Sequence, residues 1–230
     1  MDEMKQYLAA TEIIDCNHPE VRAFASETAG DAGNDVEKAV RLYYAVRDGI
    51  WYDPYHPFFL PEHYRASNIL KGRRGFCIPK QSLLCALGRA LGIPSRPGYA
   101  TVRNHLATRQ LLEFLGTDLF VYHGFTEFHL EGKWVKATPA FNAELCRRHG
   151  VEPLEFNGRE DSIFQPYNSD NRKYMEYVEF LGSYPDIPVA EIVEGFEKTY
   201  GRERVQGWIE SFKINGSIRR GRFDTEDVVR

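Results

Sequence analysis

Residues 75–96 (GFCIPKQSLLCALGRALGIPSR) constrain the fold more than any other stretch of the chain. Their apolar positions recur at spacings of three and four, which predicts one buried helix face that carries Leu83, Leu84, Leu87, Ala90 and Leu91. Gly92 ends this helix and Pro94 prevents its continuation. Cys77 therefore lies at or just before the helix start, where free backbone N–H groups and the helix dipole favour a thiolate. The stretch predicts a cysteine nucleophile, whereas a buried structural thiol is the alternative.

The rest of the chain predicts an α+β protein with four consecutive regions. These are a helical lead-in over residues 1–34, a core over 35–149, an appendage of loop and helix over 150–212, and a mobile tail over 213–230. Further helices are expected over residues 20–28, 35–49, 65–71, 105–115, 142–149, 189–200 and 203–212, and strands over 95–103, 119–130 and 133–138. Three prolines between residues 50 and 64 exclude a long helix there and favour an extended segment at the edge of a cleft.

The predicted hairpin over residues 119–138 carries the candidate partner of Cys77. A two-residue turn at positions 131–132 places Leu130 opposite Lys133 and Phe125 opposite Thr138. Thr138 then shares a face with His123 and lies diagonal to it, at about 7–8 Å between the backbones. A histidine near a cysteine at a helix start can act as the base of a thiol nucleophile.

Composition excludes several classes of function. The net charge of −4 argues against a broad nucleic-acid surface, and no apolar run is long enough to cross a bilayer. The first residues lack the apolar core of a signal peptide, and the four cysteines form no C-x-x-C pair. We therefore expect reduced thiols in the cytoplasm, with no cofactor and no metal. Oligomeric state does not follow from the sequence.

Four motifs in one order resemble the transglutaminase-like superfamily of papain-fold cysteine enzymes. They are an aromatic residue and Cys77 at a helix start, A-L-x-R-A-L-G-I-P-x-R, His123 in His-x-aromatic-x-Glu, and Gly-x-Trp-Val. The resemblance covers about residues 36–142, and each motif is weakly specific alone. It implies a papain-like α+β core in which the helix that carries the nucleophile, Cys77, packs on an antiparallel sheet that bears His123, with a helical appendage at the C-terminal side.

One position departs from the pattern of the family, which has aspartate where this chain has Thr138. Threonine can accept a hydrogen bond from an imidazole, but it cannot offset the charge of an imidazolium. Papain-like sites use a neutral asparagine, so neutrality alone does not abolish the chemistry. Asn142 could orient the histidine if the chain turns back. Glu127 could not, since four residues along a strand span about 13 Å.

The resemblance implies a thiol-dependent acyl-transfer enzyme that acts on a peptide or a small amide. Cys77 would form a thioester, His123 would hold the thiolate and protonate the leaving amine, and Thr138 would orient the ring. We favour hydrolysis over transamidation, because the chain lacks the calcium-binding elements of animal transglutaminases. Thr138 motivates an alternative, a binding or scaffold protein on the same fold. A metal site built from His123, Glu127 and His129 is disfavoured because such strand positions diverge.

Overall fold

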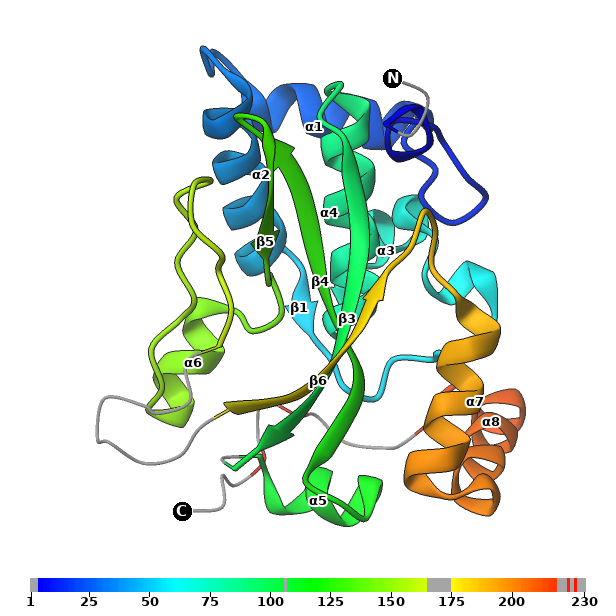
Figure 1. Ribbon diagram of the computed structural model, residues 1–230. Coiled ribbons are helices and arrows are strands. Elements are labelled where there is room, and N and C mark those ends of the chain that lie inside the picture. The colour runs from blue at the N-terminus through cyan, green and yellow to red at the C-terminus, as the bar shows by residue number, and fades with distance from the viewer. Residues whose placement is uncertain (1–3, 106, 165–174, 219–222, 224–225, 227–230) are drawn as a thin grey trace.

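The computed structural model describes residues 4–105, 107–164, 175–218, 223 and 226, and it has an α+β architecture (Figure 1). Its helical elements are η1 (Lys5–Tyr7), α1 (Pro19–Ala29), α2 (Asp35–Gly49), η2 (Pro61–His63), α3 (Ala66–Gly72), α4 (Cys77–Ala90), α5 (Arg109–Leu115), α6 (Ala143–His149), α7 (Val189–Tyr200) and α8 (Arg202–Asn215). Its strands are β1 (Trp51–Tyr52), β2 (Arg74–Gly75), β3 (Ser95–Asn104), β4 (Leu119–Leu130), β5 (Lys133–Ala137) and β6 (Met175–Ser183).

The main sheet has four antiparallel strands in the order β5-β4-β3-β6. A two-residue turn joins β4 to β5, and both of its residues, Glu131 and Gly132, have positive φ. The predicted register of this hairpin is confirmed, because Leu130 pairs with Lys133. The last pair is Thr126 with Ala137, so Thr138 follows directly after β5.

Strand β4 is irregular just before His123. The register against β3 shifts between the pair of Ala100 with His123 and the pair of Val102 with Phe120, which leaves two residues of β4 opposite one of β3. Tyr122 lies in this bulge with a φ of 54°. A bulge interrupts the alternation of side chains and redirects those beside it. It lets four consecutive side chains, at positions 120–123, line the same cavity.

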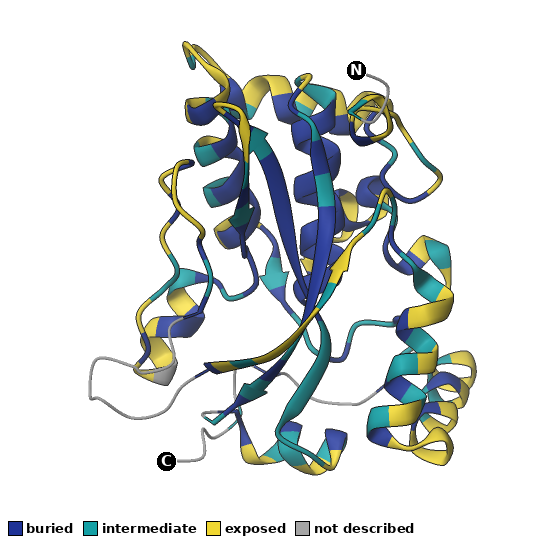
Figure 2. Cartoon of the chain, in the orientation of Figure 1, coloured by how far each residue is buried: buried dark blue, intermediate teal, exposed yellow. Residues whose placement is uncertain are grey.

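Helix α4 lies at the centre of the protein. It packs on β4 and β3, and α1, α2 and α3 pack around it (Figure 1). Its residues from Cys77 to Arg89 are all buried, which Figure 2 shows as a continuous dark helix behind the sheet. The helix approaches β4 closely at Gly124, where a Cβ atom would overlap the side chain of Gln81. The arrangement of a Cys77 helix on an antiparallel sheet is therefore confirmed.

Most predicted elements form, and two of the differences have local causes. Helix α5 begins at Arg109 and not at 105, because the Thr108 hydroxyl accepts a hydrogen bond from Leu111 N and caps the helix. Strand β6 was not expected from the sequence. Its residues are mostly exposed, and glutamates interrupt its apolar pattern, so the two-residue period is weak.

The C-terminal helices α7 and α8 lie side by side at one end of the sheet, and α7 contacts β4 (Figure 1). Helix α8 extends to Asn215, into the stretch 213–230 for which the sequence predicts mobility. Within that stretch Ile218 and Phe223 are buried, and most of its other residues lie outside the described part of the chain. None of the described helices is both long enough and apolar enough to cross a membrane.

Candidate active site

Cys77 is the first residue of α4, and the local sequence fixes that start. Phe76 is the N-cap, and Gly75 pairs with Tyr52 in the short parallel ladder of β1 and β2. A Cβ atom on Gly75 would overlap the ring of Pro79, so only glycine fits beside this first turn. Proline is tolerated in the first turn because its missing N–H would be unbonded there anyway. The predicted position of Cys77 at a helix start is confirmed.

The Cys77 thiol is 8% exposed. Burial raises its pKa to about 11, although backbone N–H groups of Gly124, Ile78 and Cys77 itself favour the thiolate. Desolvation thus outweighs the hydrogen bonds and opposes the thiolate that the helix start favours. Whether Cys77 is ionised stays a prediction.

His123 is also buried, at 4% exposure, and burial lowers its pKa to about 4. Its Nε2 atom has no hydrogen-bond partner among the described residues. The imidazole packs against Phe164, with 5.3 Å between the ring centroids. Burial therefore favours the neutral form of the His123 imidazole at neutral pH.

Cys77 and His123 line the same cavity, which has a volume of about 60 Å³. Its other walls come from β1 and the segment after it, α5, β4, α7 and α8. The lining residues are Tyr52, Pro54, His56, Phe58, Phe76, Cys77, Leu111, Phe114, Leu115, Phe120, Val121, Tyr122, His123, Phe196, Tyr200, Trp208 and Ile218. The cavity is thus mostly aromatic, and its two candidate reactive groups are among its few polar members.

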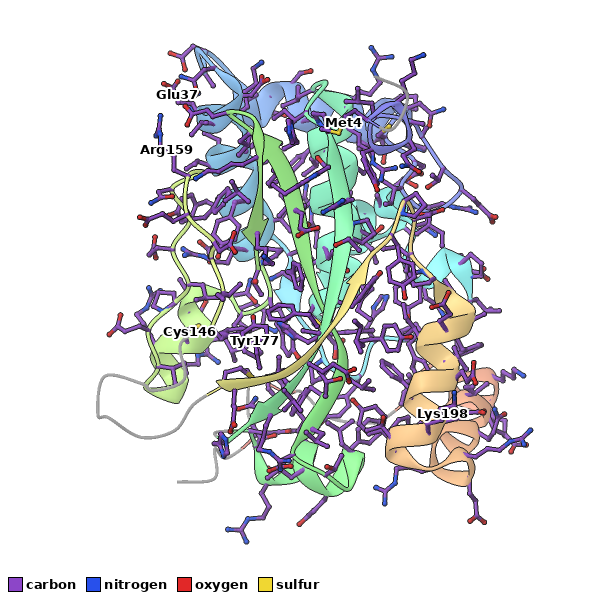
Figure 3. All side chains as sticks on the ribbon, in the orientation of Figure 1. Met4, Glu37, Cys146, Arg159, Tyr177 and Lys198 are labelled. Atoms are coloured by element: carbon purple, nitrogen blue, oxygen red, sulfur yellow. The ribbon has the colours of Figure 1, made fainter. Side chains whose placement is uncertain are left out.

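Thr138 is buried beside a residue that the sequence did not indicate. Its hydroxyl and the hydroxyl of Tyr177, from β6, are both buried without a hydrogen bond of good geometry within the described chain. Burial raises the pKa of Tyr177 to about 12, and the nearby Thr138 side chain opposes this shift. Tyr177 lies on β6, at the lower part of the sheet in Figure 3. Thr138 therefore has a tyrosine hydroxyl as its polar neighbour.

Asn142 binds backbone groups, whereas the sequence suggested that it could orient His123. Its Oδ1 accepts a hydrogen bond from Tyr52 N, and its Nδ2 donates to Arg47 O and Ile50 O. Lys80, fully buried in α4, donates to the same two carbonyl oxygens, at 2.8 and 2.7 Å. Asn142 therefore fastens the end of α2 to β1, and its amide is not available to orient His123.

The two other polar residues on the predicted strand face are also engaged elsewhere. Glu127 accepts hydrogen bonds from Arg96 Nε at 2.7 Å and from Ser183 Oγ at 2.6 Å. The ring of His129 packs edge-on against Trp134. Among the described residues, no three histidine, cysteine or acidic side chains are grouped so that they could hold a metal ion.

Comparison with protein families gives one match. Residues 22–139, about half of the chain, match the model of the transglutaminase-like superfamily. The chain belongs to the transglutaminase-like superfamily. The matched region begins in α1 and ends one residue after Thr138, so it contains Cys77, His123 and Thr138 but not β6, α7 or α8.

Two solved structures resemble this member of the transglutaminase-like superfamily. A proposed cysteine protease from Cytophaga hutchinsonii has a TM-score of 0.47 at 18% identity, over 60% of this chain and 42% of its own. A proposed protease from Parabacteroides distasonis has a TM-score of 0.39 at 20% identity, over 52% of this chain and 23% of its own. The chain thus spans less than half the length of either protein. None of the curated proteins matches it.

Several residues of this site lie outside the superfamily region and were missed from the sequence. Tyr200 and Trp208 line the cavity from α7 and α8. Tyr177, the neighbour of Thr138, comes from β6, whose alternation of apolar and polar residues is weak. Helix α7 has buried residues at spacings of four (Ile192, Phe196 and Tyr200), a signal that predicts the helix but not what it covers. The cavity is therefore completed by residues for which the shared family motifs give no indication.

Proposed function

We propose that this protein is a thiol-dependent acyl-transfer enzyme that hydrolyses amide or peptide bonds. The observation that supports the proposal best is the shared cavity of Cys77, at the start of α4, and His123, on β4. The order of these residues in a transglutaminase-like domain supports the same assignment. The apolar walls of the cavity suit a peptide or small amide, because they exclude water from a reacting carbonyl group.

The proposed reaction has two stages. The thiol proton of Cys77 passes to His123, the sulfur attacks the carbonyl carbon, and backbone N–H groups at the start of α4 stabilise the oxyanion. The C–N bond then breaks, the amine leaves with the proton from His123, and a thioester remains on Cys77. In the second stage His123 takes a proton from water, the hydroxide attacks the thioester, and the acid and the thiol are released.

The neutral resting pair gives this mechanism a specific requirement. Burial raises the pKa of Cys77 to about 11 and lowers the pKa of His123 to about 4, so the proton stays on sulfur until the site changes. A bound substrate that supplies hydrogen-bonding groups to the imidazole would make the proton transfer less unfavourable. We therefore propose His123 as a general base during attack, in place of a preformed ion pair, with Thr138 as the residue beside its ring.

A library of peptide coumarylamides tests the proposal. We expect the wild-type protein to release coumarin from a subset of peptides, and Cys77→Ser to reduce this release at least about a thousandfold. Cys16→Ser is the matched control, since Cys16 is another free, buried thiol outside the cavity. Mass spectrometry of the acylated Cys77 peptide would identify the intermediate. Turnover that survives Cys77→Ser at the wild-type rate would end the proposal.

A binding protein on the same fold is the second candidate. The lack of a charged partner at Thr138 and the neutral state of His123 favour it. On this alternative the protein binds peptides with an affinity that Cys77→Ser leaves unchanged, and no acyl-enzyme accumulates. The four free cysteines support a reducing compartment such as the cytoplasm for either function.

A further inference from the structure

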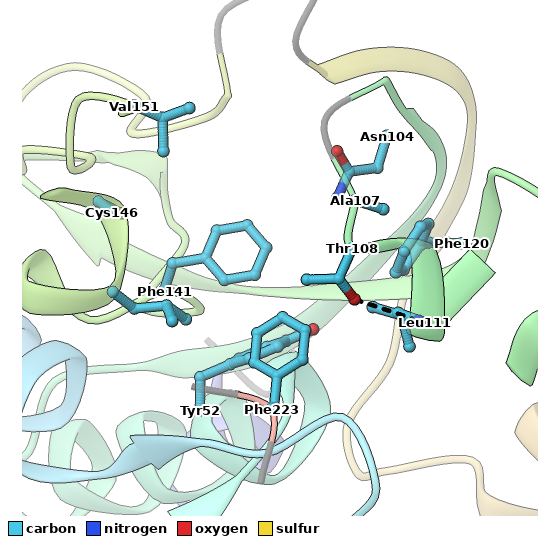
Figure 4. Close-up of a pocket in the computed structure, with 11 residues that line it drawn as sticks. Tyr52, Asn104, Ala107, Thr108, Leu111, Phe120, Phe141, Cys146, Val151 and Phe223 are labelled. Atoms are coloured by element: carbon cyan, nitrogen blue, oxygen red, sulfur yellow. Dashed lines mark hydrogen bonds between the residues drawn. The ribbon is translucent and has the colours of Figure 1, made fainter. Parts of the chain in front are cut away.

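A second, smaller cavity adjoins the one that contains Cys77. It has a volume of about 30 Å³ and shares Tyr52, Leu111 and Phe120 with the first. Figure 4 shows the rings of Tyr52, Phe141 and Phe223 on one side of this space and Thr108 on the other. The two cavities are therefore neighbouring parts of one groove along the candidate active site.

Part of this groove is filled by the protein's own C-terminal stretch. The ring of Phe223 is buried against Tyr52 and Tyr55, with centroid distances of 5.5 and 6.5 Å. Three residues further on, the carboxylate of Glu226 accepts hydrogen bonds from Tyr55 Oη and Thr108 Oγ1, both at 2.7 Å. Ile218 lines the cavity of Cys77 itself.

The groups that hold Glu226 form a built carboxylate site. Tyr55 is 6% exposed and Thr108 is fully buried, so both hydroxyls are fixed within the fold. Thr108 Oγ1 also accepts the hydrogen bond of Leu111 N, which leaves its own proton free to point toward the carboxylate. Hydroxyl groups that donate to a carboxylate form strong, charge-assisted hydrogen bonds.

A backbone hydrogen bond links Phe223 and Glu226, since Glu226 N donates to Phe223 O at 3.1 Å. These two residues present an aromatic side chain and a carboxylate to one edge of the groove. We propose that this groove is a peptide subsite that recognises an aromatic residue three positions before an acidic one, and that residues 218, 223 and 226 occupy it in the resting protein. The subsite rests on the function proposed above, for which it names acidic, aromatic peptides as the substrate class.

The consequence is competition between the C-terminal stretch and a substrate. An intramolecular ligand is present at a high effective concentration, so an external peptide binds weakly until the stretch leaves. Weakening the internal contacts should therefore tighten external binding without altering the groove. Ordinary packing contacts would not give tighter peptide binding when they are weakened, so this gain would identify the internal contacts as those of a bound ligand.

The experiment uses the full-length double variant Phe223→Ala/Glu226→Gln and a fluorescein-labelled peptide, Phe-Asp-Thr-Glu with an amidated end. We expect fluorescence anisotropy to show at least about tenfold tighter binding to this variant than to the wild-type protein. The matched control is Lys213→Gln/Ile214→Ala, which makes the same two kinds of change at exposed positions of α8, where Ile214 is 73% exposed. This control should bind as the wild-type protein does.

Peptide variants test the two recognised groups separately. Replacing the phenylalanine by alanine, or the glutamate by glutamine, should weaken binding to the double variant about tenfold each. Adding Tyr55→Phe, which removes only the hydroxyl, should weaken binding of the glutamate peptide more than binding of the glutamine peptide, because a hydrogen bond to a carboxylate is stronger than one to an amide oxygen. Equal binding of all three peptides, or no gain in the double variant, would overturn the subsite.

The same samples distinguish this inference from the proposed function. Peptide binding that depends on phenylalanine and glutamate but never leads to cleavage would end the enzymatic proposal and support the subsite. Cleavage of peptides without any preference for these residues would overturn the subsite and support the enzyme. Cys77→Ser in the double variant should bind the peptide unchanged, since the thiol is not one of the recognising groups.

Discussion

Two sets of buried polar groups, one around Lys80 and Asn142 and the other made of His123, Thr138 and Tyr177, differ in how their hydrogen bonds are satisfied. Around Lys80 and Asn142, the Lys80 side-chain nitrogen and the Asn142 amide nitrogen donate to carbonyl oxygens at the end of α2, and the Asn142 amide oxygen accepts from β1. Around the candidate site, His123 Nε2, Thr138 Oγ1 and Tyr177 Oη are buried without a hydrogen-bond partner in the described chain.

The comparison separates structural polar groups from groups that are available to a ligand. A buried polar atom that lacks a partner costs about 1–3 kcal/mol, so a fold that keeps three of them together loses stability there. Buried polar atoms without a hydrogen-bond partner are rare in folded proteins, and a catalytic or ligand-binding role is one established reason for them. The first set holds the backbone in place, whereas the second leaves three buried polar atoms unbonded, and one of them belongs to His123 in the wall of the cavity.

Asn142→Ala should give the largest effect on stability. The substitution leaves Tyr52 N–H buried without its partner and removes one of the two hydrogen bonds to each of Arg47 O and Ile50 O, which keep Lys80 as a donor, so we expect a loss of about 4 kcal/mol in the free energy of unfolding. Asn34→Ala is the matched control, because Asn34 caps the other, exposed end of α2 and should cost about 1 kcal/mol. Urea denaturation measures both. Equal losses would mean that burial does not distinguish the two asparagines.

The pH dependence of stability tests the second set of buried polar groups. Burial lowers the pKa of His123 from 6.5 to about 4, so between these values the unfolded chain binds a proton that the folded protein does not. Folded-state stability should therefore fall by about 3 kcal/mol as the pH drops from 6.5 to 4, and change no further from this cause below pH 4.

His123→Leu isolates that contribution. The variant removes the titrating group, so the decrease in its unfolding free energy between pH 6.5 and 4 should be smaller than that of the wild type by about 3 kcal/mol. His63, whose pKa burial also lowers to about 4, contributes to both proteins and cancels in the difference. Parallel stability curves for the two proteins would show that His123 is solvated or paired in solution.

The reactivity of Cys77 gives the next test. A thiol whose pKa is about 11 has far less thiolate at pH 8 than a free one, so we expect iodoacetamide to alkylate Cys77 about a hundredfold more slowly than the synthetic peptide Gly-Phe-Cys-Ile-Pro-Lys. Mass spectrometry of proteolytic peptides resolves Cys77 from the three other thiols. A midpoint below pH 8.5 would reveal a preformed ion pair and contradict the neutral resting state.

Local patterns in the sequence were sufficient for the parts of the fold that carry the two candidate residues. The period of α4 and the two-residue turn of the hairpin are short-range signals, and they correctly placed Cys77 at a helix start and Leu130 opposite Lys133. Whether Cys77 and His123 act together stays a prediction. Their shared cavity depends on the order of the strands, which the family resemblance supplied and the spacing of residues did not.

The remaining features depend on contacts between distant parts of the chain. The raised pKa of Cys77 follows from burial under α7, α8 and β4, which no pattern near Cys77 indicates. Asn142 is bound to residues about ninety positions away in sequence, so its structural role could not be read from its neighbourhood. Tyr177 was missed because β6 is an exposed edge strand with a weak period.

Thr138→Val should give the smallest change in the free energy of unfolding, and it tests directly whether the Thr138 hydroxyl has a structural role. Valine has nearly the shape of threonine without the hydroxyl, and that hydroxyl is buried without a good hydrogen bond. Unfolding free energy should therefore change by less than about 1 kcal/mol, in contrast to Asn142→Ala. Tyr177→Phe, which removes the neighbouring unbonded hydroxyl, should likewise change it little. A loss above about 2 kcal/mol in either variant would mean that these hydroxyls are bonded in solution. In that case Thr138 would belong with the first set, and its departure from the aspartate of the family would reflect stability and not a change in chemistry.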